Sequence, residues 1–192
     1  MLGNKKDKQN KHIFFNKKYT DDLTSIYYTQ FDVLYNYGKR FTSDNFLIED
    51  AIQNVFVNLI ILDDNYEKIN NLRNYILVSF RNELIQLINK SRKHDMLDQV
   101  NEFEFITEYS NNESFEDEEI NIKKDIINNY ITKNTTSKQQ EILYLRFDIG
   151  LSYEEISKML EITIESCRTL VYRTIKKMSA DSTLLNKLSK IK

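Results

Sequence analysis

The chain has 192 residues, room for one domain or two small ones, and its 41% hydrophobic residues can bury a core. No Pro, three Gly, one Cys and two His exclude an intrachain disulfide and argue against a Cys/His zinc site or a Gly-rich phosphate-binding loop. The net charge of −2 taken alone argues against nucleic-acid binding. We find no signal-peptide core or membrane span, so we expect a soluble, cytoplasmic, mostly helical protein.

The charge is unevenly distributed along the chain. Residues 1–94 carry 14 basic and 11 acidic side chains, and residues 123–192 carry 13 and 8, whereas residues 95–122 carry ten acidic and no basic side chains. This division predicts two mildly basic folded parts and an acidic tether. The expected organisation is a basic disordered tail at 1–18, a helical domain at 19–94, an acidic linker at 95–122, a second helical domain at 123–179 and a C-terminal tail at 180–192.

Three helices are predicted in the first part. Apolar residues predict one at about 24–39, and the pattern from Leu47 to Ile60 repeats at i, i+3, i+4 and i+7, as one face of a helix does. Asp44 is a suitable N-cap for this second helix. A third pattern runs from Leu72 to Lys90. Three helices of this length can share one core.

The second part predicts short helices with clear start signals. The linker is expected to be largely extended, and an apolar helical pattern returns at 120–130. Capping boxes are predicted for Ser137 with Gln140 and for Ser152 with Glu155. Thr163 is predicted to be the N-cap of the third helix. Gly150 suits a left-handed residue at the end of the first of these helices. The succession is typical of a helix-turn-helix unit.

The helix expected at 164–178 has two different faces. One face should lie in the core: Cys167, Val171, Thr174, Ile175 and Met178. The other is polar and offers groups that can bind phosphate or base edges: Glu165, Ser166, Arg168, Thr169, Tyr172, Arg173, Lys176 and Lys177. An ordinary solvated face is the alternative for a lone amphipathic helix. The two capped short helices before it favour DNA binding.

Several runs resemble a known family. The run Ile48-Glu49-Asp50-Ala51-Ile52-Gln53-Asn54-Val55-Phe56 resembles the helix that sigma factors of the sigma-70 family present to the RNA polymerase core enzyme. Leu72-Arg73-Asn74-Tyr75-Ile76 and Arg81-Asn82 resemble the promoter −10 helix of that family. The block from Ser137 through Leu151-Ser152-Tyr153-Glu154-Glu155-Ile156 to Arg173 resembles its −35-binding helix-turn-helix. The order and the chain size resemble the extracytoplasmic-function (ECF) group.

The resemblance implies roles for particular residues. Polymerase binding would involve Asp50, Gln53 and Phe56, and −10 DNA would meet Asn65, Tyr66, Tyr75, Arg81 and Asn82. The −35 element would be read by Glu165, Ser166, Arg168, Thr169, Tyr172, Arg173 and Lys176. The acidic linker would follow the path by which RNA leaves the polymerase. The chain departs from the family pattern at four positions. Tyr75 stands in place of Trp, Gln86 in place of Asp, Glu161 in place of Gly and Leu170 in place of Arg.

The expected fold is therefore all-α, with an N-terminal helical bundle and a C-terminal helix-turn-helix module joined by an acidic linker. The expected function is that of a sigma factor, which is not an enzyme and needs no catalytic residue, cofactor, metal or small-molecule substrate. Its partners would be core RNA polymerase, promoter DNA and an anti-sigma factor. One alternative is a helix-turn-helix regulator that acts as a dimer without polymerase docking, and another is a helical adaptor that binds no DNA.

Overall fold

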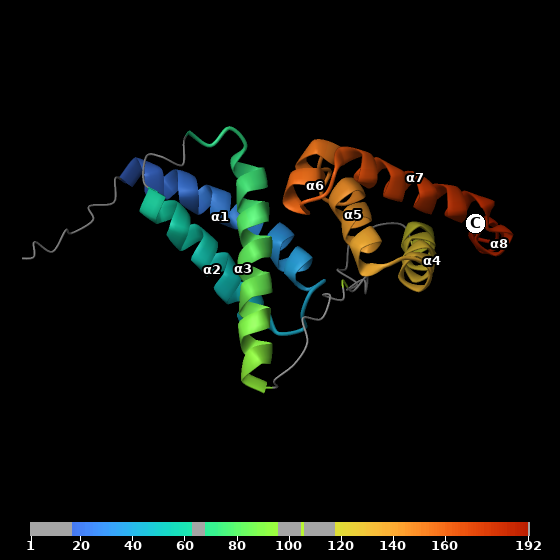
Figure 1. Cartoon of the computed structure of the whole chain (residues 1–192), viewed down its shortest axis with the longest axis horizontal. Helices are drawn as coiled ribbons and strands as arrows, with labels where there is room; N and C mark the ends of the chain where they lie inside the picture. The colour runs from blue at the N-terminus through green and yellow to red at the C-terminus, as the bar shows by residue number, and fades with distance from the viewer. Residues whose placement is uncertain (1–16, 63–67, 96–104, 106–117, 192) are drawn as a thin grey trace, which may run out of the picture.

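The computed structural model describes residues 17–62, 68–95, 105 and 118–191. Within these residues the chain forms helices and no strand, which confirms the all-α class (Figure 1). The helices are α1 (Lys17–Gly38), α2 (Asn45–Leu62), α3 (Leu72–Asp95), α4 (Glu118–Asn134), α5 (Ser137–Phe147), α6 (Tyr153–Met159), α7 (Ile164–Ala180) and α8 (Ser182–Ser189).

Helices α1, α2 and α3 pack together as the N-terminal module (Figure 1). The apolar face predicted for α2 is buried from Ile48 to Leu59, whereas Ile60, predicted on the same face, is 38% exposed. The Asp44 carboxylate accepts the backbone N–H groups of Phe46 at 2.9 Å and Leu47 at 3.4 Å, so Asp44 caps α2 as expected. α1 begins at Lys17, inside the segment predicted to be a disordered tail, and residues 1–16 lie outside the described part.

Gly38 lets the end of α1 approach the other two helices of this module. A Cβ atom at Gly38 would lie 2.7 Å from Cγ2 of Ile48 and 3.0 Å from Cζ of Phe80, both of which are fully buried. Glycine is therefore required here by space, because any side chain would collide with the core.

α2 is the one helix, among the described residues, that is long and apolar enough to cross a membrane by length and composition. Six of its residues are buried in the core of the N-terminal module: Ile48, Ala51, Ile52, Val55, Phe56 and Leu59. A core helix of a folded domain meets the same length and composition criteria, so this feature is weak evidence for a membrane span.

Helices α5, α6 and α7 form the core of the C-terminal module. Ser152 and Glu155 make the predicted capping box at α6, and the Thr163 hydroxyl accepts the Ser166 N–H at 3.1 Å at α7. The box predicted at α5 is wrong by one residue, because the side chain of Thr136 pairs reciprocally with Gln139. The same spacing of cap and amide occurs at both positions, so the sequence pattern alone did not separate them.

Two boundaries of the predicted organisation are also wrong. α4 begins at Glu118, so its first turn lies inside the segment predicted to be an extended linker, most of which is outside the described residues. The predicted C-terminal tail contains α8, which Asp181 caps by accepting the N–H groups of Thr183 and Leu184 at 2.9 and 3.0 Å. Leu184 is buried, and α8 packs beside α4.

Candidate nucleic-acid and polymerase interfaces

The polar face of α7 is presented to solvent over most of its length. Six of the seven residues predicted to meet −35 DNA are exposed, and the seventh, Thr169, is half-buried. Cys167, Val171 and Thr174 are buried against the module, as predicted. Ile175 is a correction, because its side chain is 46% exposed and extends the outward face instead of the core. Met178 is half-buried.

Contacts between α6 and α7 hold the start of this face. The guanidinium of Arg168 lies 3.5 Å from the Glu154 carboxylate and 5.8 Å from the ring centre of Tyr153. Arg146 of α5 lies over the same ring at 4.7 Å and donates to the Leu151 carbonyl at 2.8 Å. The Tyr153 ring thus contacts one cation from α5 and one from α7, and these contacts help to hold α7 against α5 and α6.

Glu161, in the turn between α6 and α7, adopts a left-handed backbone with φ of +52°. It is the one non-glycine residue with positive φ in the described part of the chain, and it stands where the family pattern has Gly. A backbone conformation that favours Gly is therefore adopted here by a residue with a side chain. A left-handed conformation costs an ordinary residue roughly 1–2 kcal/mol.

Replacing Glu161 with Gly is expected to raise the free energy of unfolding by about 0.5–1 kcal/mol, because relief of the left-handed strain exceeds the added entropy of the unfolded chain. Urea denaturation followed by circular dichroism measures the change. The E161A variant is the matched control, since it removes the carboxylate and keeps the strain, and it should not be stabilised. A less stable E161G protein would contradict this account.

One face of α2 carries an exposed stripe at helical spacing. It consists of Phe46, Asp50, Gln53, Val57 and Ile61. Asp50 and Gln53 were predicted for polymerase binding, whereas the three apolar members were missed, although they stand outside the buried period of the helix. Phe56, the third residue predicted for polymerase binding, is only 7% exposed, and its ring lies 5.0 Å from that of Tyr27.

The residues predicted to meet −10 DNA are placed differently from one another. Tyr75 and Asn82 are exposed on α3, and Arg81 is half-buried between the modules. Asn65 and Tyr66 lie outside the described residues.

Arg81 lies in a polar cluster that joins the two modules. Its Nε and Nη2 donate to the two carboxylate oxygens of Glu141 at 2.7 and 3.2 Å, and the Tyr37 hydroxyl donates to Glu141 Oε1 at 2.6 Å. Burial and the Glu141 carboxylate raise the pKa of Tyr37 well above its usual value, so its hydroxyl remains a donor. Burial lowers the pKa of Arg81, but the hydrogen bonds and charge of Glu141 outweigh it and leave that pKa raised.

The start of α3 makes two more contacts with the C-terminal module. Asn71 Nδ2 donates to the Glu155 carboxylate at 2.7 Å, and Arg73 Nη2 donates to the Ile149 carbonyl at 2.8 Å. The pKa of Glu155 is lowered, chiefly by the hydrogen bond from the Ser152 backbone and in part by that from Asn71. Glu155 is therefore ionised at neutral pH.

Aromatic rings complete the contact between the modules. Tyr37 of α1 and Tyr144 of α5 stack with ring centres 5.7 Å apart, and Arg40 lies 4.9 Å from the Tyr144 ring. The linker residue Phe105 is buried among Tyr37, Phe41 and Tyr144, with ring centres 5.3–6.2 Å away. We call the whole set the module interface: Tyr37, Arg40, Phe41, Asn71, Arg73, Arg81, Phe105, Glu141, Tyr144, Ile149 and Glu155. The sequence predicted none of these contacts, because the partners are far apart in the chain.

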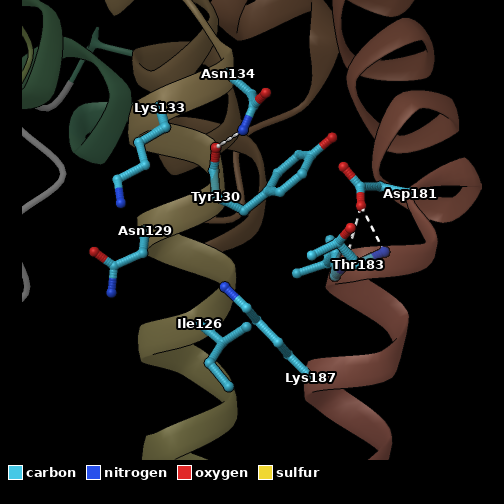
Figure 2. Close-up of a pocket in the computed structure, with 9 residues that line it drawn as sticks. Ile126, Asn129, Tyr130, Lys133, Asn134, Asp181, Thr183 and Lys187 are labelled. Atoms are coloured by element: carbon cyan, nitrogen blue, oxygen red, sulfur yellow. Dashed lines mark hydrogen bonds between the residues drawn. The ribbon is translucent and has the colours of Figure 1, made fainter.

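A separate cavity of about 500 Å³ lies between α4 and α8 (Figure 2). Tyr130 and Asp181 face each other across it, with Lys133 and Lys187 at its sides (Figure 2). Burial and the nearby Asp181 raise the pKa of Tyr130. In the described part of the chain, no group of three or more His, Cys, Asp or Glu side chains is arranged to hold a metal ion.

The geometry defines a two-module helical protein with a helix-turn-helix unit and a solvent-facing third helix. A family model described as Sigma-70 region 2 matches residues 28–94, and one described as Sigma-70, region 4 matches residues 136–178. The chain belongs to the sigma-70 family of transcription initiation factors, with the organisation of the ECF group.

The solved structures also contain this fold. One similar chain comes from the co-crystal structure of the sigma factor RpoE in complex with the anti-sigma factor NepR from Bartonella quintana. The similarity has a TM-score of 0.56 at 18% identity and covers 92% of this chain and 99% of that one. No curated protein matches the chain.

Proposed function

We propose that the chain is a sigma factor that binds core RNA polymerase and directs promoter-specific initiation of transcription. The presence of both sigma-70 regions in the family order, with the outward face of α7 open to solvent, is the observation that carries the proposal. A cytoplasmic initiation factor without catalytic activity of its own agrees with the family.

The −35 element would be read by α7. Ser166, Arg168 and Thr169 lie at the N-terminal end of the helix, which enters the major groove in this type of unit. Arg173 and Lys176 lie one to two turns further along and would meet phosphate or base edges, with Glu165 and Tyr172 at the sides of the same face.

The −10 element would be met by α3 and the segment before it. Tyr75 offers an exposed ring for stacking on an unpaired base, and Asn82 lies two turns further along. Arg81 would neutralise backbone phosphate, and Asn65 and Tyr66 would capture a flipped base.

The exposed stripe on α2 would bind the core polymerase. Asp50 and Gln53 are its polar centre, and the exposed rings and branched chains of Phe46, Val57 and Ile61 flank them. Such a mixture of apolar side chains around a few polar groups is typical of a protein interface. Phe56 would support this face from behind. An anti-sigma factor, as in the complex of the similar RpoE chain, is a further expected partner.

The direct test is run-off transcription by purified core RNA polymerase with and without this chain, from a library of genomic promoter fragments of the same organism. Transcripts that depend on the chain support the proposal. Core-independent, sequence-specific binding by a stable dimer in sedimentation would support the dimeric regulator instead.

Replacing Arg173 with Ala is expected to weaken promoter binding by the holoenzyme by about 1–3 kcal/mol if the side chain contacts a base. A smaller, sequence-independent loss with a shallower salt dependence would indicate phosphate contact only. Fluorescence anisotropy of a labelled promoter fragment over a range of salt measures both. Lys187 is an exposed cation on α8, so K187A is the matched control and should bind as the native chain does.

A further inference from the structure

Two residues at the start of α6 hold the side chain of Arg168 on α7. Its Nη2 lies 3.5 Å from Oε1 of Glu154, and its guanidinium carbon lies 5.8 Å from the centre of the Tyr153 ring. An arginine side chain has many rotamers, and their loss opposes any contact that fixes the guanidinium at one base. Contacts within the protein that orient the guanidinium beforehand reduce this cost.

The residues that hold Arg168 are themselves fixed by the fold. Tyr153 and Glu154 lie between Ser152 and Glu155, whose capping box begins α6, so the backbone is held on both sides of them. The guanidinium of Arg146 on α5 lies 4.7 Å from the centre of the Tyr153 ring. The place at which α6 meets Arg168 is therefore set by the helix-turn-helix unit.

The ion pair uses only part of the Arg168 guanidinium. A guanidinium has five N–H donors, and the Glu154 carboxylate lies within ion-pair distance of Nη2. The usual contact of arginine with guanine needs two parallel N–H bonds to O6 and N7, and the remaining donors suffice for it. The Arg168 and Glu154 side chains are 56% and 54% exposed, so DNA can reach the guanidinium while the pair persists.

A carboxylate beside Arg168 favours contact with a base over contact with phosphate. Phosphates attract any nearby cation regardless of sequence, and an unrestrained guanidinium would turn toward them. Glu154 holds the guanidinium in one direction, and its own negative charge repels the DNA backbone. The pair thus gives up some sequence-independent affinity and gains discrimination, as elements that disfavour wrong contacts do.

We propose that Glu154 is a positioning residue that directs Arg168 to a base pair of the −35 element instead of the phosphate backbone. The inference rests on the proposed function and deepens it, because it names the pair of side chains that sets specificity at one base pair. Glu154 acts through Arg168, and the Tyr153 ring supports the same guanidinium.

The test measures sequence discrimination by the holoenzyme assembled from core RNA polymerase and the full chain. Promoter fragments randomised over the −35 element are bound and the bound fraction is sequenced, which gives the preference at each base pair. R168A should lose about tenfold or more of the preference at the base pair that it reads. E154A should lose about two- to fivefold at that same base pair, as expected for an exposed ion pair, and nothing elsewhere.

Three further measurements separate positioning from a general structural loss. The E154A/R168A double variant should discriminate no worse than R168A, because Glu154 acts through Arg168. The E154A holoenzyme should bind a fragment with an unrelated −35 sequence at least as tightly as the native one, since a negative charge has been removed. E154Q, which keeps the side-chain length, should match E154A.

D125A is the matched control, because it removes an exposed carboxylate from α4 of the same module and should keep the native preference at every base pair. Losses by E154A and R168A at one shared base pair, with no further loss in the double variant, support the proposal. Native preference of E154A at the base pair that R168A no longer reads overturns it. Equal loss by E154A at all positions, or no loss by R168A, also overturns it.

These contrary results leave the proposed function standing, because the native holoenzyme still selects a −35 sequence in each of them. A native holoenzyme that selects no −35 sequence would contradict the proposed function itself, and the role of Glu154 with it.

Discussion

Replacing Phe80 with Ala is expected to lower the free energy of unfolding by about 3–5 kcal/mol, the usual cost of deleting a large ring from a closed core. Phe80 is fully buried on α3, and its ring reaches the place where α1 passes closest, beside Gly38 and Tyr37. The backbone of α1 cannot easily collapse into the vacated space, because Gly38 already lies against Ile48.

Chemical denaturation followed by far-UV circular dichroism measures this effect. The matched control is Q86A, which truncates an exposed side chain on the same helix and should change the free energy of unfolding by less than about 0.5 kcal/mol. A loss below about 1 kcal/mol for F80A would mean that the three-helix core does not close around this ring.

The sequence predicted most helices because their signals are local. The buried period of α2 and the caps at Asp44, Ser152 and Thr163 depend on residues within two turns of one another. The error at α5 has the same origin, since two overlapping cap patterns are equally good locally. α8 was missed because it is short, and its burial depends on α4, which is far away in the chain.

The module interface could not be predicted from local patterns. Tyr37 and Glu141 are 104 positions apart, and no sequence motif near either residue indicates that they pair. For Phe56 two lines of sequence reasoning differed: the apolar period placed it in the core, and the family resemblance placed it at the polymerase. The structure buries it, so the period gave the better account of its side chain in this form.

The burial of Phe56 decides which variant tests polymerase binding. Truncating this ring would cost about 3–5 kcal/mol of stability, so a loss of transcription by F56A would not report on the surface. Asp50 is exposed at the centre of the α2 stripe, where a substitution changes the charge without opening the core.

The D50K variant is expected to bind core RNA polymerase at least about tenfold more weakly. The new positive charge would face polymerase groups that are complementary to the negative charge of Asp50. Fluorescence anisotropy of the labelled chain titrated with core enzyme measures the affinity, and run-off transcription should fall in parallel. Binding of the free chain to oligo-dT should be unchanged, since the α2 stripe lies apart from the cations of α3 and α7.

D32K is the matched control for this charge reversal. Asp32 is exposed on α1 of the same module, outside the α2 stripe, so the variant has the same net charge and should bind core enzyme as the native chain does. Equal weakening by D32K and D50K would mean that total charge governs the association. Native affinity for D50K would place the polymerase contact on another face of the module.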